Sequence, residues 1–273
     1  MRLFTALGLS AALLLSAQPA AALNAPTLRS QAVCLKVLKK ANAARKPAQL
    51  QQCDFLYADL SSADLRKANL SEADLRQANL TGANLTRANL SSADFSYANL
   101  TGVKISKARF TRAKLSGANL TGIDFTNANL ERAELSNLDF DSTRGERGSN
   151  LSNLNFSGAN LRGARLDYAN LTNATFTNSN LGGIVFVWAN LTNATLTNAN
   201  LRGSLLNHAI LTNANFTNAD LSGVGFGSTD ISNANFTNAN LANADLTYND
   251  LTQADFTGAN LRGAKMPDGS IHP

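Results

Sequence analysis

Residues that perform chemistry are scarce in this sequence, which has 2 cysteines, 2 histidines, 2 methionines and 1 tryptophan among 273 residues. One histidine, His208, lies in a repeated segment, and the other, His272, lies in the C-terminal tail. Neither is paired with a cysteine as a catalytic thiol needs, and no phosphate-binding glycine loop or metal-ligand spacing is present. We therefore predict no catalytic residue, no cofactor and no metal, and a protein that is not an enzyme.

Long hydrophobic runs are also missing, except at the N-terminus. The stretch MRLFTALGLSAALLLSAQPAAALNAPT has one basic residue, Arg2, then an apolar run, then small residues ending at Ala22. This pattern predicts a secretory signal peptide over residues 1–22, with an uncleaved membrane anchor as the alternative. No cysteine follows closely enough to indicate a lipoprotein. We expect an exported protein that is not membrane-embedded after cleavage.

Acidic residues are absent from residues 28–46, and this absence explains the net charge of +5. Of the 24 basic residues, Arg2 and six in this segment account for seven, which leaves 17 against 19 acidic residues elsewhere. The six are Arg29, Lys36, Lys39, Lys40, Arg45 and Lys46. Because the excess is local, the charge does not indicate a nucleic-acid-binding body, and we expect no nucleic acid partner.

What the sequence does contain is a five-residue repeat. Leu or Phe, with Ile at positions 105 and 231, recurs at every fifth position from Phe55 to Phe140 and again from Leu151, ending with Met266. Two residues before most centres is a small residue, usually Ala, and Asp or Asn usually lies between them. Residues two apart in an extended chain point to the same side, so Ala and Leu point inward and Asp or Asn points outward. The remaining two residues suit a corner, which indicates short extended faces stacked as a solenoid.

The phenylalanines indicate how many repeats form one coil. Twelve centres are Phe, and within the second block most of them differ by multiples of twenty residues. If the break between the blocks shifts the register by one residue, seven of the twelve share one column: Phe55, Phe95, Phe156, Phe176, Phe216, Phe236 and Phe256. Four pentapeptides per coil therefore fit best. Identical side chains then stack along the rod, as in Asn178, Asn198, Asn218 and Asn238.

The tandem A-(D/N)-L-x-x units resemble the pentapeptide-repeat family over about residues 54–268. The resemblance implies an all-β solenoid, a right-handed quadrilateral parallel β-helix, here of about ten to eleven coils. We divide the chain into residues 23–47 (a capping helix), 48–268 (the β-helix, interrupted at 141–150) and 269–273 (a tail). Because such repeats are abundant in cyanobacteria, the resemblance also implies a bacterial periplasm or a thylakoid lumen, or secretion. It says little about function, because members have different roles.

The two ends differ. Residues 28–45 read as a helix with Thr27 as its N-cap and Pro47 beyond its end, and Cys34, Leu38 and Ala41 share one face. We expect this helix to cover the first coil, tied by a Cys34–Cys53 disulfide because both cysteines belong to an exported chain. Two buried free thiols are the alternative. No helix follows Met266, so an uncovered last coil predicts a homodimer formed end to end, as the resemblance also implies.

Candidate partner-binding residues lie on the outside of the rod. One corner column contains Tyr168, Trp188, His208 and Tyr248, and the same one-residue shift would place Lys67, Arg87 and Lys107 below them. A basic cluster lies nearby: Lys104, Lys107, Arg109, Arg112 and Lys114. The interruption at residues 141–150 predicts a loop that exposes three charged residues: Arg144, Glu146 and Arg147. Aromatic residues beside Lys or Arg are typical of recognition surfaces, although a corner also tolerates any residue.

Four functions fit a rigid rod without an active site. The first is an extracytoplasmic scaffold that binds an unknown protein partner. The second is carbohydrate or cell-wall binding through the aromatic column, because sugar rings stack on aromatic faces. The third is ice or surface binding through two hydroxyl columns, which run from Thr172 to Thr252 and from Thr177 to Thr257. The fourth, DNA mimicry as in some cytoplasmic members of the resembling family, requires a strongly acidic rod and is disfavoured.

Overall fold

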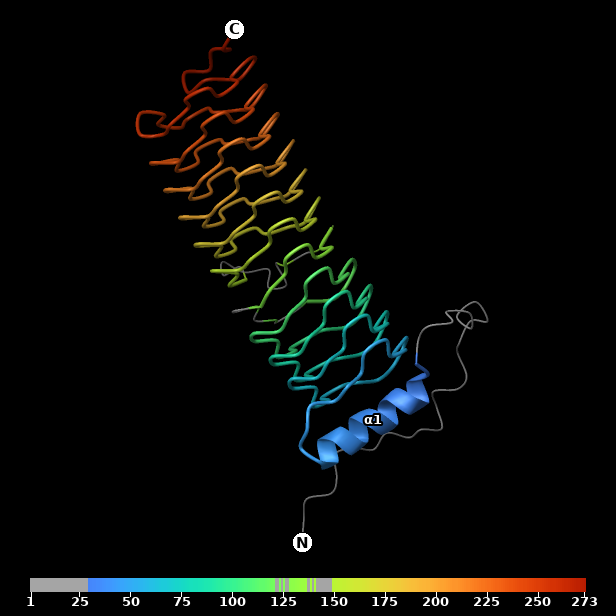
Figure 1. Cartoon of the computed structure of the whole chain (residues 1–273). Coiled ribbons are helices and arrows are strands. Elements are labelled where there is room, and N and C mark those ends of the chain that lie inside the picture. The colour runs from blue at the N-terminus through green and yellow to red at the C-terminus, as the bar shows by residue number, and fades with distance from the viewer. Residues whose placement is uncertain are drawn as a thin grey trace, which may run out of the picture.

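The structure, a computed structural model, describes residues 29–273 except for 121, 122, 124, 126, 127, 137, 139 and 141–148. The predicted signal peptide over residues 1–22 lies outside the described residues. The elements are one helix, α1 (Gln31–Ala43), and isolated parallel bridges that join successive coils. Figure 1 shows the coils stacked as a rod with α1 lying across the N-terminal end. Among the described residues, no helix is long and apolar enough to cross a membrane.

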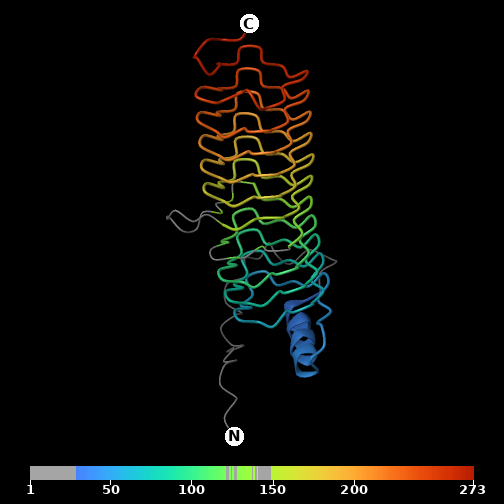
Figure 2. The ribbon, with the colours of Figure 1, turned by 90° about the vertical axis from the view of Figure 1, so that its left-hand side faces the viewer.

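Bridges join each coil to the next with a spacing of twenty residues, as in Asp54 with Asp74 and Asn215 with Asn235. This register confirms the prediction of four pentapeptides per coil. Backbone hydrogen bonds follow the same spacing, since the Phe216 N–H donates to the Asn235 carbonyl at 2.7 Å. The coils remain stacked in one direction up to the C-terminus when the rod is turned by 90° (Figure 2). Most backbone polar groups therefore have partners in neighbouring coils.

The core follows the predicted alternation of inward and outward residues. The central Leu and Phe side chains and the Ala two residues before them are almost fully buried. Phe236 stacks between Phe216 and Phe256 with ring centroids 5.0 Å apart on each side. The outward Asn or Asp closes each corner, because its Oδ1 accepts the N–H two residues later, as Asn215 does from Thr217 at 2.9 Å. The corner residues have φ values near +60°, the left-handed region.

The register across the break differs from the sequence prediction. Asn129 bridges to Asn155 and Glu134 to Asn160, so this coil adds six residues to the usual twenty rather than one. Compared with the predicted insertion of one residue, the five additional residues correspond to one whole repeat and therefore rotate the columns by one corner. Phe110, not Phe55 or Phe95, therefore shares the column of the second-block phenylalanines. We call residues 48–140 the first half and 149–268 the second half of the rod.

The corrected register also rearranges the corner residues. The Phe140 N–H donates to the Arg165 carbonyl at 3.0 Å, which places Phe140 below Leu166. The column of Tyr168, which we call corner 1, therefore continues into the first half as Ser62, Gly82 and Gly102. The next corner in chain order, corner 2, has Lys67, Arg87 and Lys107 in the first half. In the second half, corner 2 has the following asparagines: Asn153, Asn173, Asn193, Asn213 and Asn233.

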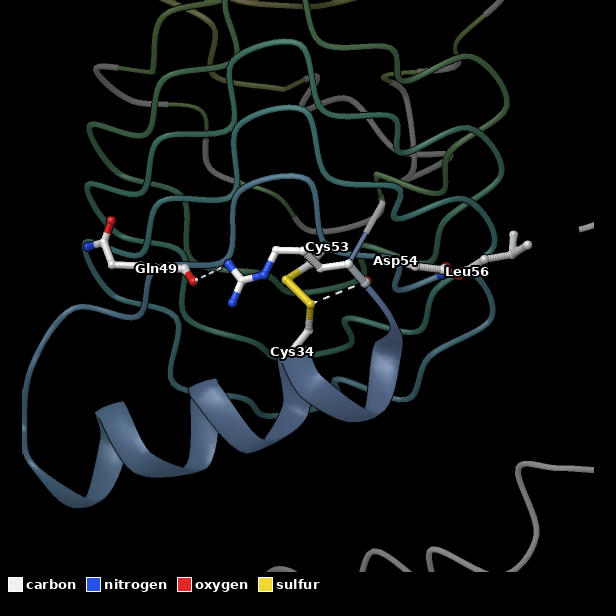
Figure 3. Close-up of a disulfide and its surroundings, with 6 residues drawn as sticks. Cys34, Gln49, Cys53, Asp54 and Leu56 are labelled. Atoms are coloured by element: carbon white, nitrogen blue, oxygen red, sulfur yellow. Dashed lines mark hydrogen bonds between the residues drawn. A yellow bond between two sulfur atoms is a disulfide. The ribbon is translucent and has the colours of Figure 1, made fainter. Parts of the chain in front are cut away.

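Helix α1 covers the first coil. It begins after Ser30, so the predicted Thr27 cap and the predicted range 28–45 are wrong by a few residues. Arg29, before the helix, bridges to Cys53 and so forms part of a coil edge below the first coil. Cys34 on α1 forms a disulfide with Cys53, with the two Cα atoms 5.9 Å apart and both side chains fully buried (Figure 3). Leu38 is also buried, so the predicted face of the helix is the one that contacts the core.

The C-terminal end is partly covered, unlike the uncovered coil that the sequence predicts. After Met266 the chain turns back, and Ile271 forms an antiparallel bridge with Lys265. The His272 N–H donates to the Ala264 carbonyl at 2.8 Å, and the Gly263 N–H donates to the His272 carbonyl at 2.9 Å. This edge of the last coil is therefore paired within the chain. Three central residues of the last coil remain only half-buried: Leu251, Phe256 and Leu261.

Candidate functional site

The aromatic residues of corner 1 form the most unusual surface of the second half. Tyr168, Trp188, His208 and Tyr248 all have left-handed backbone conformations, with φ between 58° and 64°. Glycine and asparagine adopt this conformation at lower cost than bulky residues do. In the first half, Gly82 and Gly102 occupy the same corner. The sequence therefore places bulky rings at positions where the backbone favours small residues.

The rings stack along the rod axis. Tyr168 and Trp188 have nearly parallel planes, 2° apart, with centroids separated by 6.4 Å. Trp188 and His208 are closer, with centroids 4.3 Å apart and planes 13° apart. Each of these two rings therefore covers one face of the other. Tyr248 is separated from them by Ser228 and is 82% exposed.

Apolar residues extend the aromatic corner onto the adjoining faces, where the repeat usually has Asn, Asp, Ser or Thr. Val185 and Val187 lie on the face that precedes corner 1, and Leu205 lies directly above Val185. Ile210 lies on the face that follows the corner. Leu205 and Ile210 are 46% and 41% exposed, respectively. We call these four residues, together with Tyr168, Trp188 and His208, the aromatic surface.

The sequence interpretation missed the four aliphatic members of this surface. Their signal was available, because Val185, Val187, Leu205 and Ile210 replace polar residues at outward positions of the repeat. The next corner along the same face adds to the contrast. It is formed by three stacked glycines, Gly183, Gly203 and Gly223. A Cβ atom at any of these positions would have no neighbouring atom within 4 Å. The apolar face therefore has a raised aromatic edge on one side and a bare edge on the other.

The predicted basic cluster is a separate feature. Lys104, Lys107, Arg109, Arg112 and Lys114 are all exposed and lie at successive outward positions around a single coil of the first half. Of these, only Lys114 lies near a carboxylate, with its Nζ 4.0 Å from Asp94, within the part of the chain that the structure describes. The prediction that this basic region and the aromatic residues share one edge is wrong, because the break rotates the columns. The loop residues Arg144, Glu146 and Arg147 lie outside the described residues.

The hydroxyl columns serve the fold locally. The Thr172 and Thr192 hydroxyls donate to the Oδ1 atoms of Asn170 and Asn190 at 2.7 and 2.6 Å. The Thr217 hydroxyl donates in the same way to Asn215 at 2.6 Å. These bonds orient the hydroxyl protons toward the corner rather than toward solvent. The regular threonines are therefore accounted for by the corner geometry of the repeat.

Carboxylates at the same outward position have lowered pKa values. The Ser232 hydroxyl, and also the Thr212 hydroxyl, donate to Asp230 and lower the pKa of its carboxyl group. The Thr247 hydroxyl lowers the pKa of Asp245. Each shift has an ordinary structural cause, so none indicates a catalytic acid. The described residues also contain no group of three or more His, Cys, Asp or Glu side chains that could hold a metal ion.

Comparison with known proteins gives a consistent result. The family description "Pentapeptide repeats" matches residues 48–82, 68–106 and 108–144 with eight copies. The description "Pentapeptide repeat region" matches residues 149–226 and 199–272. No curated protein matches the chain.

Three solved structures illustrate what the chain is similar to. HetL, a pentapeptide repeat protein involved in heterocyst differentiation regulation from Nostoc sp. strain PCC 7120, is 36% identical over 86% of this chain and 97% of its own, with a TM-score of 0.46. Full-length QnrB1, a plasmid-mediated fluoroquinolone resistance protein, is 24% identical over 66% and 84%, with a TM-score of 0.29. A pentapeptide repeat protein from the Arabidopsis thaliana thylakoid lumen is 28% identical over 47% and 74%, with a TM-score of 0.15.

Proposed function

Since the chain belongs to the pentapeptide-repeat family, whose members are generally non-enzymatic and fold as right-handed quadrilateral β-helices, we propose that it is a scaffold that binds a protein partner through the aromatic surface. The observation that supports this function is the exposure of Trp188, Leu205 and Ile210 where the repeat usually has polar residues. Exposed apolar clusters with a polar rim are typical of protein interfaces, and Trp and Tyr dominate their binding energy.

The shape of the surface favours a protein over a sugar. A sugar ring stacks on an exposed aromatic face, whereas Trp188 and His208 each cover one face of the other, with centroids 4.3 Å apart. A protein can instead pack aliphatic side chains against the ring edges and against Val185 and Leu205. Because the glycine corner beside this face has no side chains, the backbone of a partner protein can approach it closely. This geometry favours a protein partner over the alternative of carbohydrate binding through the aromatic column.

DNA mimicry remains disfavoured, because a mimic needs a dense array of negative charges. Residues 29–140 have 16 basic and 10 acidic residues, which is an excess of positive charge. Residues 149–273 have 5 basic and 7 acidic residues, which is close to neutrality. The similarity to a fluoroquinolone resistance protein is therefore not a basis for assigning that activity.

An extracytoplasmic location forms part of the proposal. It is supported by the Cys34–Cys53 disulfide, because such bonds persist in oxidising compartments. It is also supported by the pattern of residues 1–22. We further propose that the half-buried Phe256 and Leu261 at the C-terminal end mediate homodimer formation, with the paired tail narrowing the contact. Sedimentation of the wild type and of Phe256→Asp tests the dimer, and an identical monomer mass for both would contradict it.

The partner is tested with a matched pair of variants. The first replaces Tyr168, Trp188 and Tyr248 by Asn, which the left-handed corner accepts. The second replaces Tyr57 and Tyr97 by Asn, since these exposed tyrosines also occupy left-handed corners but lie in the first half. Tagged proteins are cross-linked in the native organism, and each captured protein is then purified and titrated against both variants.

The expected result is a partner that binds the wild type and the Tyr57/Tyr97 variant with similar affinity. It should bind the triple variant of Tyr168, Trp188 and Tyr248, here called the Trp188 variant, at least about tenfold more weakly. Equal affinity for both variants would move the interface away from the aromatic surface. A glycan that binds the wild type and is lost from the Trp188 variant would replace the protein partner by a carbohydrate.

A further inference from the structure

A second surface, in the first half of the rod, has the opposite chemistry. Corner 2 presents Lys67, Arg87 and Lys107 one above another, in successive coils spaced by about 4.8 Å. Below Lys67, the chain that leaves α1 adds Arg45 and Lys46, which line the same groove as Lys67. We call these five residues the basic strip. All five are exposed.

The basic strip is not neutralised by the rest of the protein. None of its five residues forms an ion pair with a carboxylate of the described residues. Like charges in neighbouring coils repel one another, and the repulsion is only partly screened at this separation. The arrangement therefore lowers stability unless an external anion offsets it.

The backbone at corner 2 adds to this cost. Lys67, Arg87 and Lys107 have φ values of 57°, 61° and 60°, in the left-handed region that asparagine tolerates better. In the second half the same corner has asparagines, and Asn193 donates to Asn173 at 3.2 Å in a continuous ladder. Asparagine would therefore be a more stable residue at this corner, as it would at other corners of the first half, where Glu72 and Gln77 have the same conformation.

At the foot of the basic strip is a groove of about 490 Å³, lined in part by Asn42, Arg45, Lys46 and Lys67. The one carboxylate in the groove is Asp64, which is held by Arg66 through bonds of 2.8 and 2.7 Å. Asp64 therefore does not neutralise Arg45, Lys46 or Lys67. The positively charged groove therefore continues directly into the row of cations at corner 2, which runs along the rod.

We propose that the basic strip binds a linear anionic polysaccharide, such as a uronate polymer, with its first sugars in the groove and its chain along corner 2. The straight row of cations on a rigid rod matches a partner with regularly repeating negative charge. The side chains beside Arg87 are polar, with Asn84, Thr86 and Asn89 on the flanking faces, which suits a hydroxyl-rich chain. Lys107 is flanked by two further cations, Lys104 and Arg109, which add to the positive charge of the row. A protein interface would need an apolar anchor, and the strip has none among the described residues.

The experiment uses the full chain and four probes: polygalacturonate, dextran, polyglutamate and phosphatidylserine vesicles. The test variant is Lys67→Asn, Arg87→Asn, Lys107→Asn, which installs the residue found at this corner in the second half. The control variant is Arg162→Asn, Arg202→Asn, Arg262→Asn, which removes the same charge from the second half. Circular dichroism and the unfolding midpoint show that both variants fold.

We expect wild-type binding to polygalacturonate that weakens with salt, and no binding to dextran. The test variant should bind about tenfold more weakly or worse, whereas the control should stay within about twofold of the wild type. Equal losses in the two variants would show non-specific charge attraction and overturn the site. Binding of polyglutamate or vesicles but not of polygalacturonate would overturn the assignment to a polysaccharide. These outcomes are independent of the aromatic surface and of its protein partner.

Discussion

The two halves of the rod build the same corners from different residues. Corner 1 has Ser62, Gly82 and Gly102 in the first half, whereas it has rings at Tyr168, Trp188 and His208 in the second. Corner 2 shows the opposite distribution, with the bulky residues Lys and Arg in the first half and asparagine in the second. The second half departs from the residues that the left-handed corner prefers at corner 1 only, whereas the first half also has Gln, Glu, Arg and Tyr at its two remaining corners. Because the departures of the second half are confined to one corner of a shared backbone, binding rather than folding is favoured as the cause of its rings.

The core also differs between the halves, and the largest expected effect tests this difference. Phe236 is fully buried and stacks on two rings, whereas Leu90 occupies the same column in the first half without such a stack. Phe236→Ala should lower the free energy of unfolding by about 4 kcal/mol and Leu90→Ala by about 3 kcal/mol. Urea unfolding measures both. A larger loss for Leu90→Ala would show that ring stacking adds nothing to the second half.

The disulfide gives the first half a constraint that the second half does not have among the described residues. Replacing both Cys34 and Cys53 by Ala should destabilise the α1 end by about 3 kcal/mol, because the crosslink restricts the unfolded chain between two cysteines separated by 19 residues. Amide hydrogen exchange should show the loss in α1 and the first coil only. Faster exchange in the coils around Phe236 would mean that the rod unfolds as one unit rather than coil by coil.

The sequence predicted the coil but not the register between the halves, for a specific reason. A five-residue period is unchanged whether the break adds one residue or six, because six is one residue plus one whole repeat. The bridge from Asn129 to Asn155 shows that the break adds six residues to the coil. The sequence period alone does not reveal whether the insertion includes a whole repeat. This one ambiguity moved Lys67, Arg87 and Lys107 away from the corner of Trp188.

Two further differences also have local physical causes. The tail pairs through Ile271 and His272, which lie outside the repeat and have no periodic signal. The helix starts after Ser30 although Ser30 makes no side-chain cap bond, so capping propensity did not decide the boundary. By contrast, the disulfide was predictable, because the only two cysteines lie at a helix face and at an inward position of the first coil.

Exchanging the residues of corner 2 gives a smaller effect of opposite sign in the two halves. Lys67→Asn, Arg87→Asn, Lys107→Asn should raise the free energy of unfolding by roughly 1 kcal/mol, because it relieves backbone strain and repulsion. Asn173→Lys, Asn193→Lys, Asn213→Lys should lower it by roughly 2–3 kcal/mol, since it also breaks the amide ladder. Thermal unfolding measures both variants. If the first exchange destabilised the protein, the basic strip would have a structural role.

The smallest expected difference between the two halves is in the pH dependence of their stability. The hydroxyl bonds to Asp230 and Asp245 lower their folded pKa values below those of the unfolded chain. Such carboxylates contribute stability above the unfolded pKa of about 3.9, and the contribution is lost as pH falls through the folded pKa. Amide protection factors, which are corrected for the slower intrinsic exchange in acid, should therefore fall below about pH 4 in the last coils more than around Leu90. Asp230→Asn with Asp245→Asn keeps the Oδ1 acceptors but does not titrate, so it should remove part of this difference, since Asp250 and Asp255 also have lowered pKa values. An unchanged pH profile would assign the acid sensitivity to other groups.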